Sequence, residues 1–394
     1  MRRAALLIVV VALAGAGAAL WLWVAIAAPY RNFSSEGVFI VVARGASCRA
    51  VGRLLQQEGV VRSGLVFRLY CRQHPTRALQ AGEYFFERAA SGRDVFWTIA
   101  NGKIFEKQFT VREGTTIFEI ARELEAAHVV SAADFLKAAE NPAAIHELAP
   151  EAQTLEGFLF PATYRFPRNP GAGAVTEAMT AKFKEEWTRI ESDWAAKRAA
   201  AGAEGAATDP PKPKLLETVT LASLVERETP QAAERPVVAG VYENRLKKRM
   251  LLQCDPTVIY ALERVDSYEG TLTLADLRVD SPYNTYRNRG LPPGPIGNPG
   301  EAALRAALEP AASSYLYFVA NTKGGHFFAN TLAEHNWNVR RYHRLLKGLP
   351  DEPVPPAAAT AAPAPTTQKN SRHAGAGKQK AKSKASAHKR RATR

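Results

Sequence analysis

The sequence predicts an α+β protein with one N-terminal transmembrane helix and a disordered C-terminal tail. Three observations support this class: an apolar N-terminal run, a repeated pattern of strand, glycine turn and helix, and a final stretch without hydrophobic periodicity. We expect a stub at residues 1–3, a membrane helix at 4–28, a membrane-proximal domain at 36–148, a larger mixed α/β domain at 149–349 and a disordered basic tail at 350–394.

The N-terminal run at residues 4–28 carries no charged side chain. A helix of about 25 residues is long enough to cross the hydrocarbon layer of a membrane. Arg2 and Arg3 precede the run, and positive charge favours the cytoplasmic side, so the stub should stay inside and the rest of the chain outside. A cleaved signal peptide is the alternative, because small residues end the run. The length of the run, together with Trp21 and Trp23 near its end, favours an anchor.

The formal net charge of +14 is concentrated in the predicted tail. Ten Lys and Arg side chains and no acidic ones follow position 368, after a stretch rich in Pro and Ala. Two interpretations stay open: a solvated tail that aids solubility, or a basic arm attracted to anionic lipid or wall polymers. Nucleic acid is not an expected partner outside the cytoplasm.

The three cysteines, Cys48, Cys71 and Cys254, show no metal-ligand spacing. We therefore predict neither a metal site nor a cofactor. Cys48 and Cys71 could form one disulfide, although the sequence alone does not place them within bridging distance.

An internal repeat precedes the larger domain. Residues around Gly45 match residues around Gly114, 69 positions later, and each copy has the pattern of a strand, a glycine turn and a helix. In the second copy, Thr115 or Thr116 can cap a helix whose apolar stripe follows. We expect both copies to lie in one domain.

A helix over Leu215–Glu228 should end at Pro230, because proline cannot continue it. Its apolar stripe runs into Glu226, which falls on the same face as Val219 and Ala222. If that face is buried, burial and the negative helix end raise the pKa of Glu226, as a general acid requires. The alternative is a surface ion pair, for example with Arg227.

Four motifs follow one another at residues 221–229, 253–260, 281–286 and 290–296. They contain Val-Glu-Arg-Glu, Asp-Pro-Thr, Pro-Tyr-Asn-Thr-Tyr and Leu-Pro-Pro-Gly-Pro, and further motifs lie at 155–164, 315–320, 324–327 and 334–336. In this ordered set the chain resembles the endolytic murein transglycosylase, or YceG-like, family. The resemblance covers nearly all of the chain between the membrane helix and the tail.

The resemblance implies a single-pass anchor in the cytoplasmic (inner) membrane, a LysM-like subdomain and a mixed catalytic domain outside the membrane. It implies that the protein cuts nascent peptidoglycan glycan strands internally and so terminates their elongation, with cell-wall synthases as partners. It assigns catalysis to Glu226, whereas Glu228 should point to another face and be solvated.

The chemistry of such an enzyme explains why one acid can suffice. Glu226 would protonate the glycosidic oxygen between N-acetylmuramic acid and N-acetylglucosamine, and then take the proton of the muramoyl C6 hydroxyl, which attacks the anomeric carbon. The product is a 1,6-anhydro end, and no water is needed. A glycan hydrolase that uses Glu226 with Glu156 is one alternative. A non-catalytic scaffold that binds the wall is another.

Eight further residues are predicted to contact substrate: Glu156, Gln253, Asp255, Tyr283, Asn284, Tyr286, His326 and His335. Asp255 precedes Pro256 and could instead be a helix N-cap, so both roles stay open. His326 and His335 lack the third ligand of a metal site. Cys254 departs from the family pattern, which has threonine at this position, and casts doubt on any hydroxyl contact there.

Overall fold

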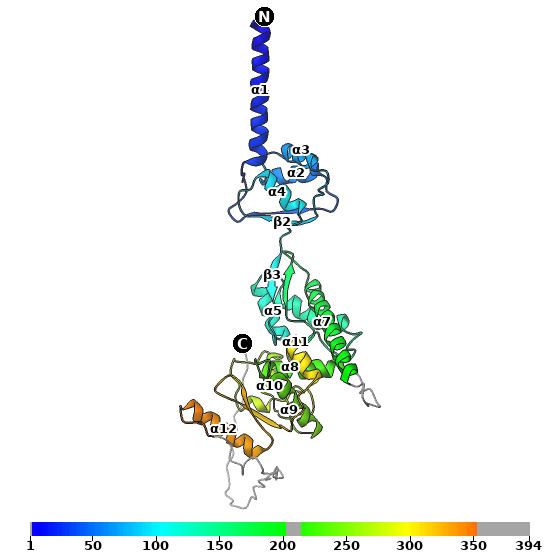
Figure 1. Ribbon diagram of the computed structural model, residues 1–394, viewed down its shortest axis with the longest axis vertical. Helices are drawn as coiled ribbons and strands as arrows, with labels where there is room; N and C mark the ends of the chain where they lie inside the picture. Colours follow the sequence, from blue (N-terminus) through cyan, green and yellow to red (C-terminus); the bar gives the residue numbers. More distant parts are fainter. Residues whose placement is uncertain (1, 202–213, 353–394) are drawn as a thin grey trace, which may run out of the picture.

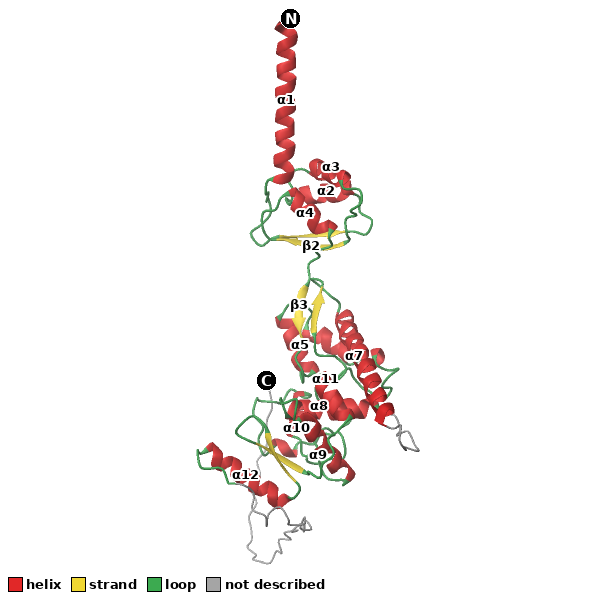
Figure 2. Ribbon diagram, in the orientation of Figure 1, coloured by secondary structure: helices red, strands yellow, loops and turns green. Residues whose placement is uncertain are grey.

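The computed structural model of the protein describes residues 2–201 and 214–352. The predicted basic tail at 350–394 lies almost entirely outside the described residues. Within them the fold is mixed α+β: helices alternate with three two-stranded antiparallel sheets (Figure 2). Figure 1 shows the parts following one another along one axis, from α1 at one end to the helices α8 to α12 at the other.

Helix α1, Arg2–Ala27, stands away from the rest of the protein (Figure 1). Residues Val9–Ala27 are long and apolar enough to cross a membrane. Large apolar side chains such as Leu13 and Trp23 are exposed along it, and lipid would remove them from water. At its end, Ala25 is buried where the helix meets the first module.

The first module is built from β1 (Val38–Val42), α2 (Cys48–Gln57), α3 (Gly64–Gln73), β2 (Gly82–Phe86) and α4 (Gly92–Ala100). Gly45 has a φ of +72°, so the chain turns after β1 in a conformation that favours glycine. The Ser47 hydroxyl then caps α2 by accepting from the Ala50 N–H. A disulfide joins Cys48 to Cys71, the pair that the sequence left possible, and ties α2 to α3.

The second module repeats this order with β3 (Lys107–Thr110), α5 (Ile117–Ala126), α6 (Ala132–Ala139) and β4 (Thr163–Phe166). Gly114 has a φ of +75°, and Thr116 with Glu119 forms a full capping box at the start of α5. The predicted strand, turn and helix repeat is therefore confirmed. The structure extends it to a strand-helix-helix-strand unit, because each copy closes with an antiparallel partner strand.

The two modules do not share a hydrophobic core, which differs from the expectation of one domain at 36–148. The first core contains Leu55, Phe67 and Phe96. The second module instead shares its core with later residues, including Phe158 and Phe183 on either side of β4. The physical reason is that β4 pairs with β3 but lies beyond residue 148. The short 3-10 helix η1 (Pro142–Ala144) and the long α7 (Ala172–Ala201) complete this unit.

The remaining part holds α8 (Leu215–Glu228), α9 (Arg235–Lys247), α10 (Asp255–Glu263), η2 (Asp276–Arg278), α11 (Glu301–Leu308), β5 (Tyr317–Ala320), β6 (His326–Ala329) and α12 (Leu332–Leu346). Helix α8 is buried along nearly its whole length between the cores of the two halves, and α9, α10 and α11 pack around it. Strands β5 and β6 form a hairpin against α9 and α12.

The disulfide should stabilise the first module. The double change Cys48→Ser and Cys71→Ser removes a cross-link that spans 23 residues, which should lower the free energy of unfolding by roughly 3 kcal/mol. Denaturant unfolding of full-length protein in detergent measures this. Reductant should destabilise the wild type and leave the double variant unchanged, and equal stability of the two oxidised proteins would contradict the prediction.

Candidate active site

The last turn of α8 presents two carboxylates, Glu226 and Glu228. Residues two apart on a helix do not face the same side, so their surroundings differ. The helix ends at Glu228, and Thr229 caps it directly before Pro230, as the sequence predicts. Each carboxylate is therefore held at the end of a helix that is buried along most of its length.

Glu226 is fully engaged inside the protein. Its side chain is only 4% exposed, one carboxylate oxygen accepts from Arg235 Nη2 at 2.5 Å, and the other accepts from the Gly300 N–H at 3.0 Å. Burial raises the pKa of Glu226, and the Gly300 N–H and Arg235 oppose that rise. The alternative of a surface pair with Arg227 is wrong, because the partner is Arg235 and the pair is buried.

Glu228 occupies a different environment from the solvated one that the sequence suggested. It lines a cavity of about 420 Å³, and its Oε1 accepts from the Tyr242 hydroxyl at 2.7 Å. Burial raises the pKa of Glu228, while hydrogen bonds from Tyr242 and Cys254 lower it. The expectation of a solvated Glu228 is wrong because α9, α10 and the β5–β6 hairpin enclose this side of α8.

The cavity collects five of the eight predicted substrate-binding residues: Gln253, Asp255, Tyr286, His326 and His335. Glu226 lines neither this cavity nor the larger one described below. The structure therefore groups most of the predicted site around Glu228. Arg245 and Phe318 complete the polar and apolar parts of its wall.

Two cavity residues lie at the start of α10. Asp255 is the first helical residue rather than the N-cap, and its carboxylate accepts from the Tyr286 hydroxyl at 2.5 Å. Burial and Asp255 together raise the pKa of Tyr286, which keeps this hydroxyl protonated. Gln253 adopts a positive φ of 52° and turns the chain into this helix. The N-cap interpretation of Asp255 is therefore wrong.

The two histidines enter the cavity from β6 and α12. His326 Nδ1 lies 2.7 Å from Glu234 Oε2. His335 stacks on Tyr317 with ring centroids 5.3 Å apart, and burial and the nearby Arg245 lower its pKa. Both are thus fixed in orientation by their neighbours.

Three predicted residues are not brought to the cavity. Glu156 is 1% exposed and accepts from the Ile117 N–H and from Asn298 Nδ2, each at 3.0 Å. Burial raises its pKa to about 8. Asn284 is buried and donates to backbone carbonyls, and Tyr283 is buried against the ring of Tyr260. These side chains hold the interior together, so the expected substrate contacts have no geometric support.

Sequence reasoning also missed residues that build the site. Arg245 is buried and donates to the carbonyls of Leu252 and Leu316 at 2.8 and 2.6 Å, so it fixes one cavity wall. Arg245 falls on the face of α9 that also carries the buried Val238, Val241 and Tyr242, and an arginine at that spacing was the available signal. Glu234 and Arg235 begin α9 in an ordinary polar segment, and no pattern there distinguishes them.

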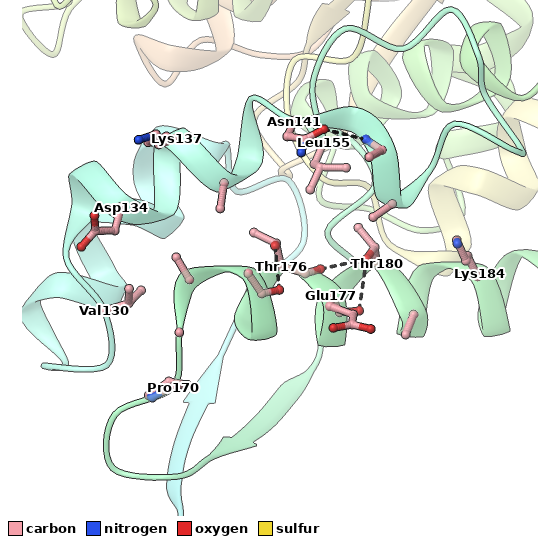
Figure 3. Close-up of a pocket in the computed structure, with 17 residues that line it drawn as sticks. Val130, Asp134, Lys137, Asn141, Leu155, Pro170, Thr176, Glu177, Thr180 and Lys184 are labelled. Carbon is pink, nitrogen blue, oxygen red and sulfur yellow. Dashed lines mark hydrogen bonds between the residues drawn. The ribbon is translucent and has the colours of Figure 1, made fainter.

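A larger cavity of about 870 Å³ lies in the second module, between α6, η1 and the N-terminal half of α7 (Figure 3). Its wall carries charges of both signs, with Lys137 and Asp134 on one side and Glu177 and Lys184 on the other. None of the predicted site residues lines it. In residues 2–201 and 214–352, no three His, Cys, Asp or Glu side chains are grouped as a metal site requires.

The cavity around Glu228 suits a polar ligand. Its wall offers carboxylates, hydroxyl, amide and imidazole groups beside the ring of Phe318, the combination that binds sugars through hydrogen bonds and ring contact. A carboxyl group with a raised pKa that opens into such a cavity can act as a general acid.

Comparisons with known proteins converge on one family. A model of the YceG-like family matches residues 40–341. The endolytic murein transglycosylase of Bacillus subtilis (strain 168) is 31% identical over 333 residues, which cover 81% of this chain and 88% of that protein. The endolytic murein transglycosylase of Streptococcus pneumoniae serotype 2 (strain D39 / NCTC 7466) is 28% identical over 341 residues, which cover 78% of this chain and 59% of that protein.

A solved structure agrees with the sequence matches. The crystal structure of a YceG-like protein from Listeria monocytogenes matches with a TM-score of 0.50 and 32% sequence identity. The match covers 77% of this chain and 99% of that chain.

The engagement of Glu226 predicts a mainly structural effect of its loss. Glu226→Gln should lower the free energy of unfolding by about 3 kcal/mol, because it leaves a buried Arg235 without its closest charge partner. Denaturant unfolding measures this. Glu243→Gln, which removes an exposed pair with Lys247, is the control and should change stability by less than about 1 kcal/mol. Equal effects of the two changes would contradict the prediction.

Burial of Glu156 predicts a pH dependence of stability. Its pKa is raised to about 8 in the folded protein, so the folded state keeps a proton that the unfolded state loses above about pH 4.5. Stability should therefore fall with rising pH between about 5 and 8, by roughly 1 kcal/mol per pH unit. Unfolding of Glu156→Gln at several pH values should show a smaller decline, and an unchanged slope would exclude Glu156 as a source of it.

Proposed function

Because the chain belongs to the YceG-like family, we propose that it cleaves peptidoglycan glycan strands as an endolytic lytic transglycosylase, with Glu228 as its catalytic acid. The family resemblance seen in the motifs is confirmed by the family match and by the relatives. The observation that carries the choice of Glu228 is the cavity, which gathers five predicted substrate residues around this carboxyl.

The sequence favoured Glu226 over Glu228, and the geometry favours the reverse. Both oxygens of Glu226 are bonded, one of them to a guanidinium that stabilises the charged form. Burial raises the pKa of both carboxyl groups, and of the two it is Glu228 that faces the cavity. A general acid must reach its substrate, so Glu226 is better suited to hold α8, Arg235 and Gly300 together.

In the proposed reaction, Glu228 protonates the oxygen that links N-acetylmuramic acid to N-acetylglucosamine. The muramoyl C6 hydroxyl then attacks the anomeric carbon as it loses its proton to a base of the site. The bond from that carbon to the protonated glycosidic oxygen breaks, and a 1,6-anhydro ring closes. The nucleophile belongs to the substrate, which replaces an intermolecular attack by an intramolecular one. Internal cleavage of nascent strands of this kind would terminate their elongation.

A glycan hydrolase is the second candidate. Such an enzyme needs another carboxylate to activate water or to attack the sugar. Glu156, the expected second carboxylate, is buried away from the cavity and bonded to Ile117 and Asn298. Asp255 is the carboxylate that shares the cavity with Glu228, and its bond to Tyr286 holds it there. A hydrolase would therefore have to use Asp255.

Helix α1 and the disulfide of the first module support an active site outside the cytoplasm. Helix α1 can anchor the protein, and we propose that its N-terminus lies in the cytoplasm and the rest outside the inner membrane, close to cell-wall synthases. The disulfide between Cys48 and Cys71 is typical of that oxidising side.

The two modules support a LysM-like role in guiding glycan strands. Their repeated strand-helix-helix-strand order contains the strand, turn and helix pattern on which the LysM-like prediction rests. A scaffold that only binds the wall would use the same modules, and it would not need the acid in the cavity.

A matched pair of variants tests the assignment. Glu228→Gln should lower the rate of anhydro-muramoyl end formation by at least 10³-fold, because the acid is lost. Glu226→Gln, corrected for its folded fraction, should keep activity within about tenfold of wild type. Mass spectrometry of products from purified glycan strands measures both.

The other outcomes are equally clear. Loss of activity in folded Glu226→Gln, with activity kept in Glu228→Gln, would return the role to Glu226. Wild-type products with reducing ends alone would indicate a hydrolase. Full activity of both variants, or no cleavage by the wild type, would favour the hypothesis of a non-catalytic scaffold.

A further inference from the structure

Both carboxylate oxygens of Glu234 contact His326. Its two carboxylate oxygens contact the backbone N–H of His326 at 3.0 Å and the ring Nδ1 at 2.7 Å. Gly325 allows this approach, since a Cβ there would lie 2.3 Å from Glu234 Oε1. The Thr229 hydroxyl, directly after Glu228 in the chain, also donates to Glu234, at 3.4 Å. The carboxylate therefore ties the start of β6 to the end of the helix that carries Glu228.

This contact fixes the state of the imidazole. An ionised carboxylate only accepts hydrogen bonds, so Nδ1 of His326 must carry the proton. The unprotonated Nε2 is then the basic atom of a ring that lines the cavity with Glu228. Phe318 packs edge-on against the ring at 5.2 Å between centroids and limits its rotation. A carboxylate that orients a histidine in this way makes the other nitrogen an effective general base.

His335, the second histidine of the cavity, lacks this arrangement. The Nδ1 atom of His335 is buried without a hydrogen-bond partner among the described residues. Within residues 2–201 and 214–352, no carboxylate forms an ion pair with its ring. The difference singles out His326 as the oriented base.

Resting on the proposed function, we infer that His326 is a second catalytic residue that accepts the proton of the attacking C6 hydroxyl, and that Glu234 positions it. As the C6 O–H proton moves to Nε2, the oxygen electron pair forms the bond to C1. The bond from C1 to the leaving O4 breaks, and O4 takes the proton of Glu228. The site is left with a Glu228 carboxylate and a His326 imidazolium, and one proton transfer between them restores both.

An acid and a base on two different residues should make kcat depend on pH in two limbs. His326 must be neutral and Glu228 protonated, so kcat should rise with pH as the base loses its proton and then fall as the acid does. The other titratable or charged groups that face this cavity are Asp255, Arg245, Tyr286 and His335. All of these groups remain in the variants tested. A change in the rising or falling limb of the pH profile of kcat can therefore be attributed to the altered residue.

Steady-state cleavage of purified glycan strands by the full-length protein tests the inference. His326→Gln should lower kcat by about 100-fold, with KM within about threefold, and should lose the rising limb. Glu234→Gln should lower kcat about tenfold and move that limb to lower pH, because an amide stabilises the imidazolium less than a carboxylate. Glu243→Gln, the same change at an exposed site on α9, should match wild type.

Three results would overturn the inference while Glu228→Gln still shows the transglycosylase to be real: a decrease in kcat of less than threefold for His326→Gln, a rising limb that persists without His326, or an effect on KM alone. If the variants fail to fold, ¹⁵N NMR of histidine-labelled wild type decides. The Nδ1–H tautomer is expected for His326, and the Nε2–H tautomer would exclude it as the base.

Discussion

The buried ion pair between Arg235 and Glu226 holds three distant segments at one point. Arg235 also contacts Glu113, next to the turn of the second module, and Glu226 accepts from Gly300 at the start of α11. Since both members are almost fully buried, loss of either partner leaves an uncompensated charge. The end of α8, and with it the direction of Glu228, depends on this pair. In the proposed function, Glu226 thus supports the site without taking part in its chemistry.

Local patterns predicted much of the fold. Gly45 and Gly114 marked the turns of the repeat, and Pro230 marked the end of α8, because each of these features acts through its own backbone. The pairing of Cys48 with Cys71 was one of a few possibilities. The sequence did not decide it, because the pair meets only when α2 packs on α3.

The features that the sequence did not predict depend on contacts between segments far apart in the chain. The apolar stripe of α8 drew attention to Glu226, but helical spacing says nothing about what covers the opposite side, where residues 253–335 enclose Glu228. Glu156 matched a family motif, and only the fold shows that Ile117 and Asn298 occupy its oxygens. The predicted domain at 36–148 leaves out β4 for the same reason, since β3 finds its partner 53 residues further on.

The contacts of the second module with later segments decide which fragments of this chain keep an intact core. The Gly114 carbonyl accepts from Arg227, its N–H donates to the Asn298 carbonyl, and Phe135 lies in the core shared with α7. A fragment cut at residue 149 would expose that core and leave Arg227 unpartnered. A fragment that begins just before β3, near residue 105, keeps every one of these contacts. The second module is therefore part of the enzyme body, and the first module with α1 is the removable portion.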